Sequence, residues 1–205
     1  MSKRSDTRRW LDKHRSDPYV KAAQKDNYRS RAVYKLAEVD ERDRLLAGKR
    51  CIVDLGAAPG GWSQYCRRAR PTARIVALDR LPMDPIEGVE FLQGDFAEQA
   101  GLDALAKALG DDRVDLVLSD MAPNLTGIMV ADQAGVMQLA ELALALCDQV
   151  LVGGGDLLIK VFQGEGFDEL LRDMRGRFGK VAVRKPKASR DASREMYLLG
   201  KGWRT

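Results

Sequence analysis

The sequence predicts an α/β domain, with a doubly wound, mostly parallel sheet that is covered by helices on both faces. Short apolar segments alternate with amphipathic ones between residues 51 and 178, which is typical of parallel strands joined by crossover helices. The last two apolar segments have no helix between them, so an antiparallel pair is expected at one edge of the sheet. In such a fold the ligand site lies at the carboxyl ends of the parallel strands.

The chain is expected to begin with a basic N-terminal arm, residues 1–26, followed by a single domain, residues 27–205. The domain opens with a helix over residues 30–46, for which Ser30 is a candidate cap. Apolar residues recur there at helical spacing, at Ala32, Val33, Leu36 and Val39.

Seven strands and four further helices are expected after this helix. The strands are short apolar runs bounded by Gly, Pro or Asp, at residues 51–55, 74–79, 89–95, 114–120, 156–162, 180–185 and 195–203. The helices show the spacing of an apolar helical face, over residues 60–69, 102–110, 131–151 and 167–178. Glycines 153–155 are expected to end the third of these helices.

The composition limits the class of protein. The 205 residues are 45% hydrophobic and 31% charged, as in ordinary globular domains. No apolar run approaches the about 18 residues that span a bilayer, and the polar N-terminus does not resemble a secretory signal. Three cysteines without a CxxC spacing are typical of reduced thiols, so a cytoplasmic protein is expected. His14 is the only histidine, which excludes a His-based zinc site or a Ser-His-Asp triad. No metal and no partner chain are expected.

Positive charge is concentrated at the two ends of the chain. Residues 1–31 hold ten Lys or Arg against four Asp or Glu, and residues 180–205 hold eight against two. Two basic segments around an acidic body can bind nucleic acid, although the first residues could also be a solvated tail. Aromatic residues between the basic ones are candidates for base stacking, namely Trp10, Tyr19 and Tyr28.

The segment VDLGAAPGGWSQY, residues 53–65, is a glycine-rich turn between a strand and a helix. By itself such a turn fits an NAD site, another nucleotide site or a tight connection. Four consecutive predicted strands, however, end in aspartate, at Asp54, Asp79, Asp95 and Asp120. A sheet edge with four carboxylates suits a cationic ligand without phosphate better than a dinucleotide. S-adenosylmethionine, which carries a sulfonium and an ammonium group, is therefore favoured over NAD.

Together with YRSRAVYKL, SDMAPN, LLIKVFQG and SREMYLLG, this segment resembles the FtsJ/RlmE family of ribosomal RNA 2′-O-ribose methyltransferases, from Tyr28 to Trp203. The resemblance implies a Rossmann-like class I methyltransferase fold with a seven-stranded sheet and an antiparallel last pair. It implies S-adenosylmethionine contacts, with S-adenosylhomocysteine as product, at Gly60, Trp62, Asp79, Asp95 and Asp120. It implies a catalytic set at Lys35, Asp120, Lys160 and Glu195. The implied substrate is a uridine in the A loop of 23S ribosomal RNA within the large subunit.

The chemistry of a ribose hydroxyl supports part of this set independently. The hydroxyl is a poor acid, and a lysine can accept its proton or orient its oxygen. Lys160 lies in the apolar run LLIKVF, where an unpaired ammonium is costly, although a strand-end lysine that reaches solvent is the alternative. Lys35 and Glu195 are unremarkable without the resemblance. Lys160 is expected to activate or orient the hydroxyl with Asp120 holding its ammonium, while Lys35 and Glu195 position the nucleotide.

Other activities fit the sequence less well. Amino-group methylation of bases commonly uses an aromatic residue after the fourth strand, where this chain has DMAPN. Methylation at pyrimidine C5 needs a nucleophilic cysteine, and none of the three cysteines is expected near that edge in a Pro-Cys context. Two alternatives stay open, namely a 2′-O-methyltransferase acting on tRNA or another structured RNA, and a non-catalytic RNA-binding factor for ribosome assembly.

Overall fold

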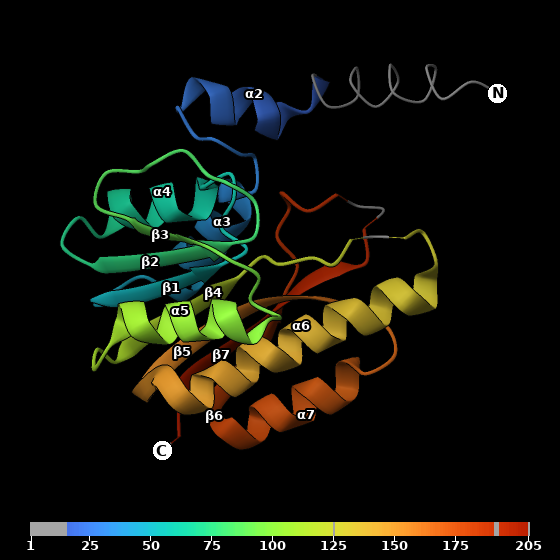
Figure 1. Ribbon diagram of the computed structural model, residues 1–205. Helices are drawn as coiled ribbons and strands as arrows, with labels where there is room; N and C mark the ends of the chain where they lie inside the picture. The colour runs from blue at the N-terminus through green and yellow to red at the C-terminus, as the bar shows by residue number, and fades with distance from the viewer. Residues whose placement is uncertain (1–15, 125, 191–192, 205) are drawn as a thin grey trace.

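The computed structural model describes residues 16–124, 126–190 and 193–204. Its centre is one seven-stranded sheet with the strand order β3-β2-β1-β4-β5-β7-β6 (Figure 1). The strands are β1 (Cys51–Leu55), β2 (Arg74–Asp79), β3 (Glu90–Gln93), β4 (Val114–Ser119), β5 (Leu151–Phe162), β6 (Phe178–Arg184) and β7 (Glu195–Trp203). The first five pair in parallel, while β7 runs antiparallel to both β5 and β6. The predicted doubly wound sheet with an antiparallel last pair is confirmed.

Helices cover both faces of the sheet, and each face has its own hydrophobic core. The helices are α2 (Pro18–Lys25), α3 (Val33–Asp43), α4 (Gly61–Ala69), α5 (Gln99–Leu109), α6 (Met129–Val150) and α7 (Phe167–Arg177). Buried residues of α5, α6 and α7 form one core with the sheet, and buried residues of α3 and α4 form the other. In Figure 1 the two groups lie on opposite sides of the strands.

The register of the sheet brings several polar residues to one edge. Leu55 of β1 aligns with Ser119 of β4, and Ser119 aligns with Ile159 of β5. Asp120 and Lys160 are the next residues on their strands, so they are neighbours at the carboxyl ends. On the other side of β5, Lys160 aligns with Tyr197 of the antiparallel strand β7. The pairing of strands that are far apart in sequence therefore assembles this edge.

Some predicted boundaries are wrong. Helix α6 ends at Val150, and glycines 153–155 lie inside β5 rather than ending the helix. Strand β5 consequently begins at Leu151, where its pairing with β4 contains a register shift. Ser30 does not cap α3, which begins at Val33 without a side-chain cap. Its hydroxyl instead accepts a hydrogen bond from the backbone N–H of Ala32, at 3.1 Å.

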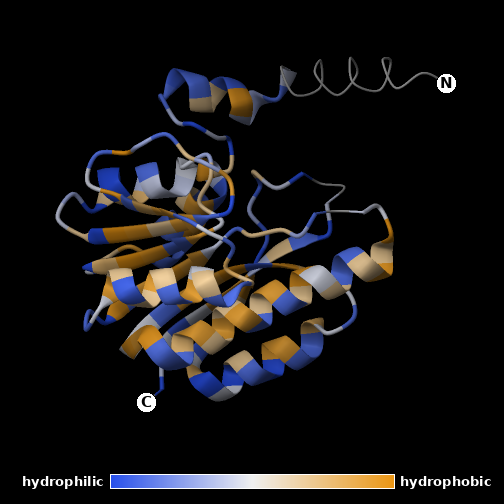
Figure 2. Ribbon diagram, in the orientation of Figure 1, coloured by the Kyte–Doolittle hydropathy of each residue, from blue (hydrophilic) through white to orange (hydrophobic). Residues whose placement is uncertain are grey.

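Helix α6 is long and apolar enough to cross a membrane by length and composition. It packs against the sheet, and residues such as Val136, Ala140 and Leu144 belong to the buried core. Figure 2 shows hydrophobic residues along this helix and along the strands beside it. Its apolar character is that of a core helix in an α/β fold.

Part of the basic arm lies among the described residues and is helical. Helix α2 is capped by Asp17, which also pairs with Arg31, and Tyr34 donates a hydrogen bond to Asp26 at 2.6 Å. The rings of the two stacking candidates that the structure describes are already in contact with guanidinium groups. Arg31 lies over Tyr19 at 5.4 Å and Arg68 lies over Tyr28 at 4.2 Å. Trp10 and His14 lie outside the described residues.

Candidate active site

Asp120 and Lys160 form an ion pair at the carboxyl ends of β4 and β5. The Lys160 Nζ atom lies 3.2 Å from Asp120 Oδ1, and it also donates a hydrogen bond to the backbone carbonyl of Asp120. The side chain of Lys160 is only 8% exposed. A buried ammonium needs such partners, so the lysine that the sequence places in an apolar run is held at the sheet edge rather than in solvent.

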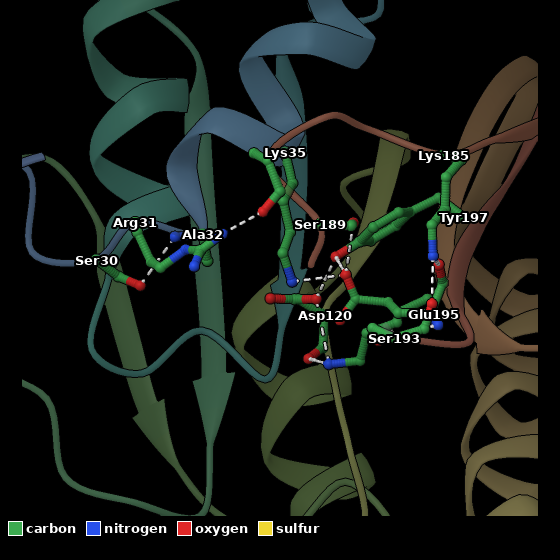
Figure 3. Close-up of polar contacts among 12 residues, drawn as sticks. Ser30, Arg31, Ala32, Lys35, Asp120, Lys185, Ser189, Ser193, Glu195 and Tyr197 are labelled. Carbon is green, nitrogen blue, oxygen red and sulfur yellow. Dashed lines mark hydrogen bonds and ion pairs between the residues drawn. The ribbon is translucent and has the colours of Figure 1, made fainter. Parts of the chain in front are cut away.

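Tyr197 adds a third group to this pair. Its hydroxyl donates a hydrogen bond of 2.7 Å to Asp120 Oδ1 (Figure 3). Burial by itself would raise the pKa of Asp120, but the charges of Lys160 and Lys35 and the hydrogen bond from Tyr197 hold it below its usual range. Burial, followed by the charge of Asp120, raises the pKa of Tyr197 well above its usual value. The phenol therefore stays protonated and the carboxylate stays ionised.

Lys35 and Glu195 form a second ion pair beside the first. Lys35 Nζ lies 2.7 Å from Glu195 Oε1, with side chains 14% and 13% exposed, and 5.9 Å from the centre of the Tyr197 ring. Ser189 donates a hydrogen bond of 2.9 Å to the same carboxylate oxygen. The four residues of the implied catalytic set thus come from α3, the end of β4, β5 and β7, and the structure brings all four together beside Tyr197. Figure 3 shows Lys35, Asp120 and Glu195 around this tyrosine.

Two cavities flank this cluster. One of about 400 Å³ lies over the carboxyl ends of β1, β2 and β4, and Asp120 is among its lining residues. The other, of about 290 Å³, is lined by Lys35 and Glu195 together with basic residues, among them Arg31 and Arg190. The two ion pairs therefore lie between an acidic cavity and a basic one.

The larger cavity contains three of the predicted cofactor residues, Asp79, Asp95 and Asp120. The Asp79 carboxylate accepts hydrogen bonds from the backbone N–H groups of Ala58, at 2.9 Å, and Leu81, at 2.8 Å. Asp95 accepts one from Ala97, also at 2.9 Å. These backbone bonds fix the carboxylates at the ends of their strands and leave further lone pairs for a ligand.

The glycine turn borders the same cavity. Gly56 lines it with a φ of 75°, and a Cβ atom there would lie 2.7 Å from Cγ of Met121, which also lines it. Gly60 and Trp62, which the sequence assigns to the cofactor, are not among the lining residues. Trp62 is 4% exposed, donates a hydrogen bond from Nε1 to the carbonyl of Ala32 and packs beside Tyr197. In the structure this indole joins α4 to the segment that carries Lys35.

Asp54 is placed differently from the other three aspartates. Strand β1 continues to Leu55, so Asp54 lies inside the strand and is fully buried. Its Oδ2 atom accepts a hydrogen bond of 2.6 Å from Ser63, while Oδ1 has no partner. Three strand-end carboxylates rather than four therefore line the cavity. Burial, with a smaller contribution from the charges of Asp120 and Asp79, raises the pKa of Asp54 from 3.8 to about 7.

This raised pKa predicts a pH dependence of stability. Between pH 4 and about 7 the folded chain holds a proton on Asp54 that the unfolded chain has released, so the free energy of unfolding falls as the pH rises through this window. The full difference is at most about 4 kcal/mol. The substitution Asp54→Asn should remove this component. Urea unfolding of both proteins at pH 5 and pH 8 measures it, and equal pH dependence in the two would contradict the assignment.

Two of the residues in this cluster are not predicted from the sequence. Tyr197 looks like an ordinary core residue of an apolar strand, and it is 1% exposed. Its position two residues after Glu195 is the available signal, because alternate residues of a strand share a face. Ser189 lies in a loop and carries no such signal. Among the residues that the structure describes, no group of three or more His, Cys, Asp or Glu side chains could hold a metal ion.

Comparisons with known proteins agree with this arrangement. The chain is 58% identical to ribosomal RNA large subunit methyltransferase E of Stenotrophomonas maltophilia (strain K279a) over 199 residues, which cover 97% of this chain and 95% of that protein. It is 54% identical to the protein of the same name from Pseudomonas aeruginosa (strain PAO1) over 205 residues, which cover 100% of this chain and 99% of that protein. A crystal structure described as a ribosomal RNA methyltransferase of Plasmodium falciparum is 31% identical, with a TM-score of 0.76, covering 86% of this chain and 98% of that one.

The family model of the FtsJ-like methyltransferases matches residues 28–203. This range contains all seven strands, both ion pairs and the two cavities beside them. The sheet, the cluster at its edge and the similarity over nearly the whole chain lead to one conclusion: the chain belongs to the FtsJ-like methyltransferase family.

Proposed function

We propose that the chain transfers a methyl group from S-adenosylmethionine to the ribose 2′-hydroxyl of a uridine in the A loop of 23S ribosomal RNA, within the large ribosomal subunit. The observation that carries this proposal is the position of two lysine–carboxylate pairs between an acidic and a basic cavity. A cationic methyl donor suits the first cavity, and an RNA nucleotide suits the second. The names of the close relatives support ribosomal RNA as the substrate.

The larger cavity fits the methyl donor by size and by charge. Its volume of about 400 Å³ lies within the range of small-molecule sites. Asp79 is placed to accept hydrogen bonds from ribose hydroxyls, and Asp95 to accept one from the adenine amino group. The close approach of Gly56 to Met121 leaves no room for a side chain at the turn. When bound, S-adenosylmethionine would supply a methyl group on an activated sulfonium, and the carboxylate of Asp120 would offset positive charge in this cavity.

Lys160 is placed to manage the proton of the acceptor hydroxyl. In the proposed reaction, the Nζ atom of Lys160 would orient the hydroxyl oxygen or accept its proton, and S-adenosylmethionine would supply the methyl group. The ammonium of Lys160 is stabilised by the carboxylate and the backbone carbonyl of Asp120. Tyr197 fixes the rotamer of that carboxylate by its hydrogen bond.

Lys35 and Glu195 are placed to hold the acceptor nucleotide. Both line the smaller cavity, in which the guanidinium groups of Arg31 and Arg190 supply positive charge for phosphates. Arg31 is itself held by Asp17 and by the carbonyl of Ala188, so it is preorganised. Arg31 of the N-terminal basic segment and Arg190 of the C-terminal one therefore lie beside the same ion pair. We further propose that the protein acts in the cytoplasm as a monomer.

The direct test is a map of 2′-O-methylation across ribosomal and transfer RNA, from cells with and without the gene for this chain. One uridine in the A loop should lose its methyl group in the absence of the protein and regain it on complementation. If only a tRNA loses a methyl group, the substrate is tRNA and not 23S ribosomal RNA. An unchanged map, with intact binding to large subunits, would instead favour the non-catalytic assembly factor.

A further inference from the structure

Three consecutive apolar side chains are exposed at the start of α6. Ile128, Met129 and Val130 are 65%, 63% and 71% exposed. In the part of the chain that the structure describes, the other large hydrophobic residues that are exposed, Leu81 and Val183, stand alone. Single exposed apolar residues need no explanation, whereas a contiguous exposed group marks an interaction site. Ile128, Met129 and Val130 are called the apolar tip below.

The backbone below the apolar tip is firmly held. The Asp132 carboxylate accepts hydrogen bonds from the N–H of Thr126 at 2.6 Å, from its hydroxyl at 2.9 Å, and from the N–H of Gly127 at 3.1 Å. The N–H of Ile128 donates to the Thr126 hydroxyl at 3.1 Å. A tip on a fixed turn keeps its shape when it meets a partner, so little conformational entropy is lost on contact.

The apolar tip stands beside the candidate active site. The loop below it begins at Asp120, and its residues Pro123 and Asn124 line the larger cavity. One turn along α6, Gln133 donates hydrogen bonds to the carbonyls of Phe162, at 3.1 Å, and Glu165, at 2.8 Å. These bonds fasten the start of α6 to the end of the strand that carries Lys160.

Positive charge accompanies the tip on the same side. The Arg194 guanidinium lies 5.9 Å from the centre of the Phe162 ring. The pKa of Asp132 is lowered mainly by the hydrogen bond from the backbone N–H of Thr126. The positive charge of Arg194 nearby lowers it further. Apolar side chains on a turn that a guanidinium approaches and that borders the candidate site match the chemistry of RNA, in which bases are apolar on their faces and phosphates are anionic.

We infer that Ile128, Met129 and Val130 form a wedge that contacts unstacked bases next to the target nucleotide of the RNA substrate. This inference rests on the proposed function. Because the side chain of Lys160 is only 8% exposed, the acceptor nucleotide has to enter the site. Apolar wedges stabilise the opened steps that let a nucleotide leave its stack in other complexes. Three side chains are too few to bury the area of about 1,200–2,000 Å² that a stable protein–protein interface needs. A role in opening the RNA thus explains why the apolar tip is exposed although its side chains take no part in methyl transfer.

The test compares the wild-type protein with a triple variant, Ile128→Ser, Met129→Ser and Val130→Ser. The variant should fold normally, because these side chains are exposed, and calorimetry should give an unchanged affinity for S-adenosylhomocysteine. With large ribosomal subunits that lack the methyl group, kcat/KM for the subunits should fall at least about tenfold, which corresponds to about 1.4 kcal/mol. The dependence of subunit binding on salt should keep its slope, because no phosphate contact is lost.

A second readout does not depend on methyl transfer. With S-adenosylhomocysteine bound, the wild-type protein should raise the reactivity of A-loop bases toward dimethyl sulfate and carbodiimide, and the triple variant should not. The matched control is Val183→Ser, which removes an exposed apolar side chain of β6 and should leave both readouts at the wild-type level.

Each outcome decides between the possibilities. A kcat/KM within twofold of wild type, or base reactivity that is equal in the two proteins, would overturn the wedge. If only self-association of the wild-type protein is lost in the variant, the apolar tip binds a second copy instead. If the wild-type protein transfers no methyl group, the proposed function fails, while base reactivity still decides whether the tip opens the loop.

Discussion

Replacing Lys160 by alanine should reduce methyl transfer by about 10²–10⁴-fold, the usual contribution of a positioned acid or base. The Lys160 side chain is 8% exposed, and its ammonium has both the carboxylate and the carbonyl of Asp120 as partners. Its loss removes the proton acceptor and leaves the carboxylate with fewer partners. The measurement is the initial rate of labelled methyl incorporation into large ribosomal subunits at saturating cofactor. A rate within tenfold of the wild-type rate would show that Lys160 does not act in the transfer step.

Two further variants make this test specific. Lys160→Arg keeps the positive charge but not an accessible neutral form, so it should fail to restore transfer if Lys160 accepts the proton. Lys49→Ala is the matched control, because Lys49 pairs with Asp156 of the same strand at 2.7 Å, with side chains 12% and 6% exposed. The Lys49→Ala protein should be less stable than wild type. At a temperature where it remains folded, its initial rate of methyl incorporation should equal the wild-type rate.

Replacing Asp79 by alanine should weaken binding of S-adenosylmethionine by about 100-fold. A charged hydrogen bond contributes about 1.5–3 kcal/mol, and this carboxylate is placed to accept from ribose hydroxyls at the cavity wall. Isothermal titration calorimetry with S-adenosylhomocysteine measures the loss directly. The turnover at saturating cofactor should fall much less, because Asp79 is not part of the two ion pairs.

The control for this variant is Asp115→Ala. Asp115 also fixes backbone N–H groups with its carboxylate, those of Arg50 at 2.8 Å and Cys51 at 2.9 Å, but at the start of β1. The two variants lose similar backbone contacts, so they should lose similar stability. Only Asp79→Ala should lose cofactor affinity. Equal affinities in the two variants would show that Asp79 acts on the fold and not on the ligand.

Much of the fold is predictable from the sequence because its central strands β1, β2 and β4 are almost wholly buried and alternate with amphipathic helices. The boundary between α6 and β5 is not, because glycines commonly end helices and here lie within a strand. The edge carboxylates Asp79 and Asp120 are predictable from strand ends. The placement of Asp54 is not, because it precedes the last residue of β1 and its fully buried carboxylate accepts a hydrogen bond from Ser63 of α4 instead of lining the cavity.

The implied catalytic set also contains residues that the sequence pattern indicates and residues that it does not. Lys160 is conspicuous, since a lysine inside an apolar run is costly to bury without a partner. Lys35 and Glu195 are not, because a lone charged residue on a helix or at a strand start looks like any solvated side chain. Their 2.7 Å contact joins residues that are 160 positions apart, and local pattern holds no information on such a pairing. Only the resemblance to a family indicates them.

The site also needs both ends of the chain. Lys35 comes from the first helix of the core, while Glu195 and Tyr197 come from the final strand, which inserts between β5 and β6. A growing polypeptide therefore has no complete candidate site until β7 has left the ribosome and paired with β5. Chains that end before β7 should lack methyl transfer even where the cofactor cavity has formed, so truncation before this strand should not yield a partly working protein.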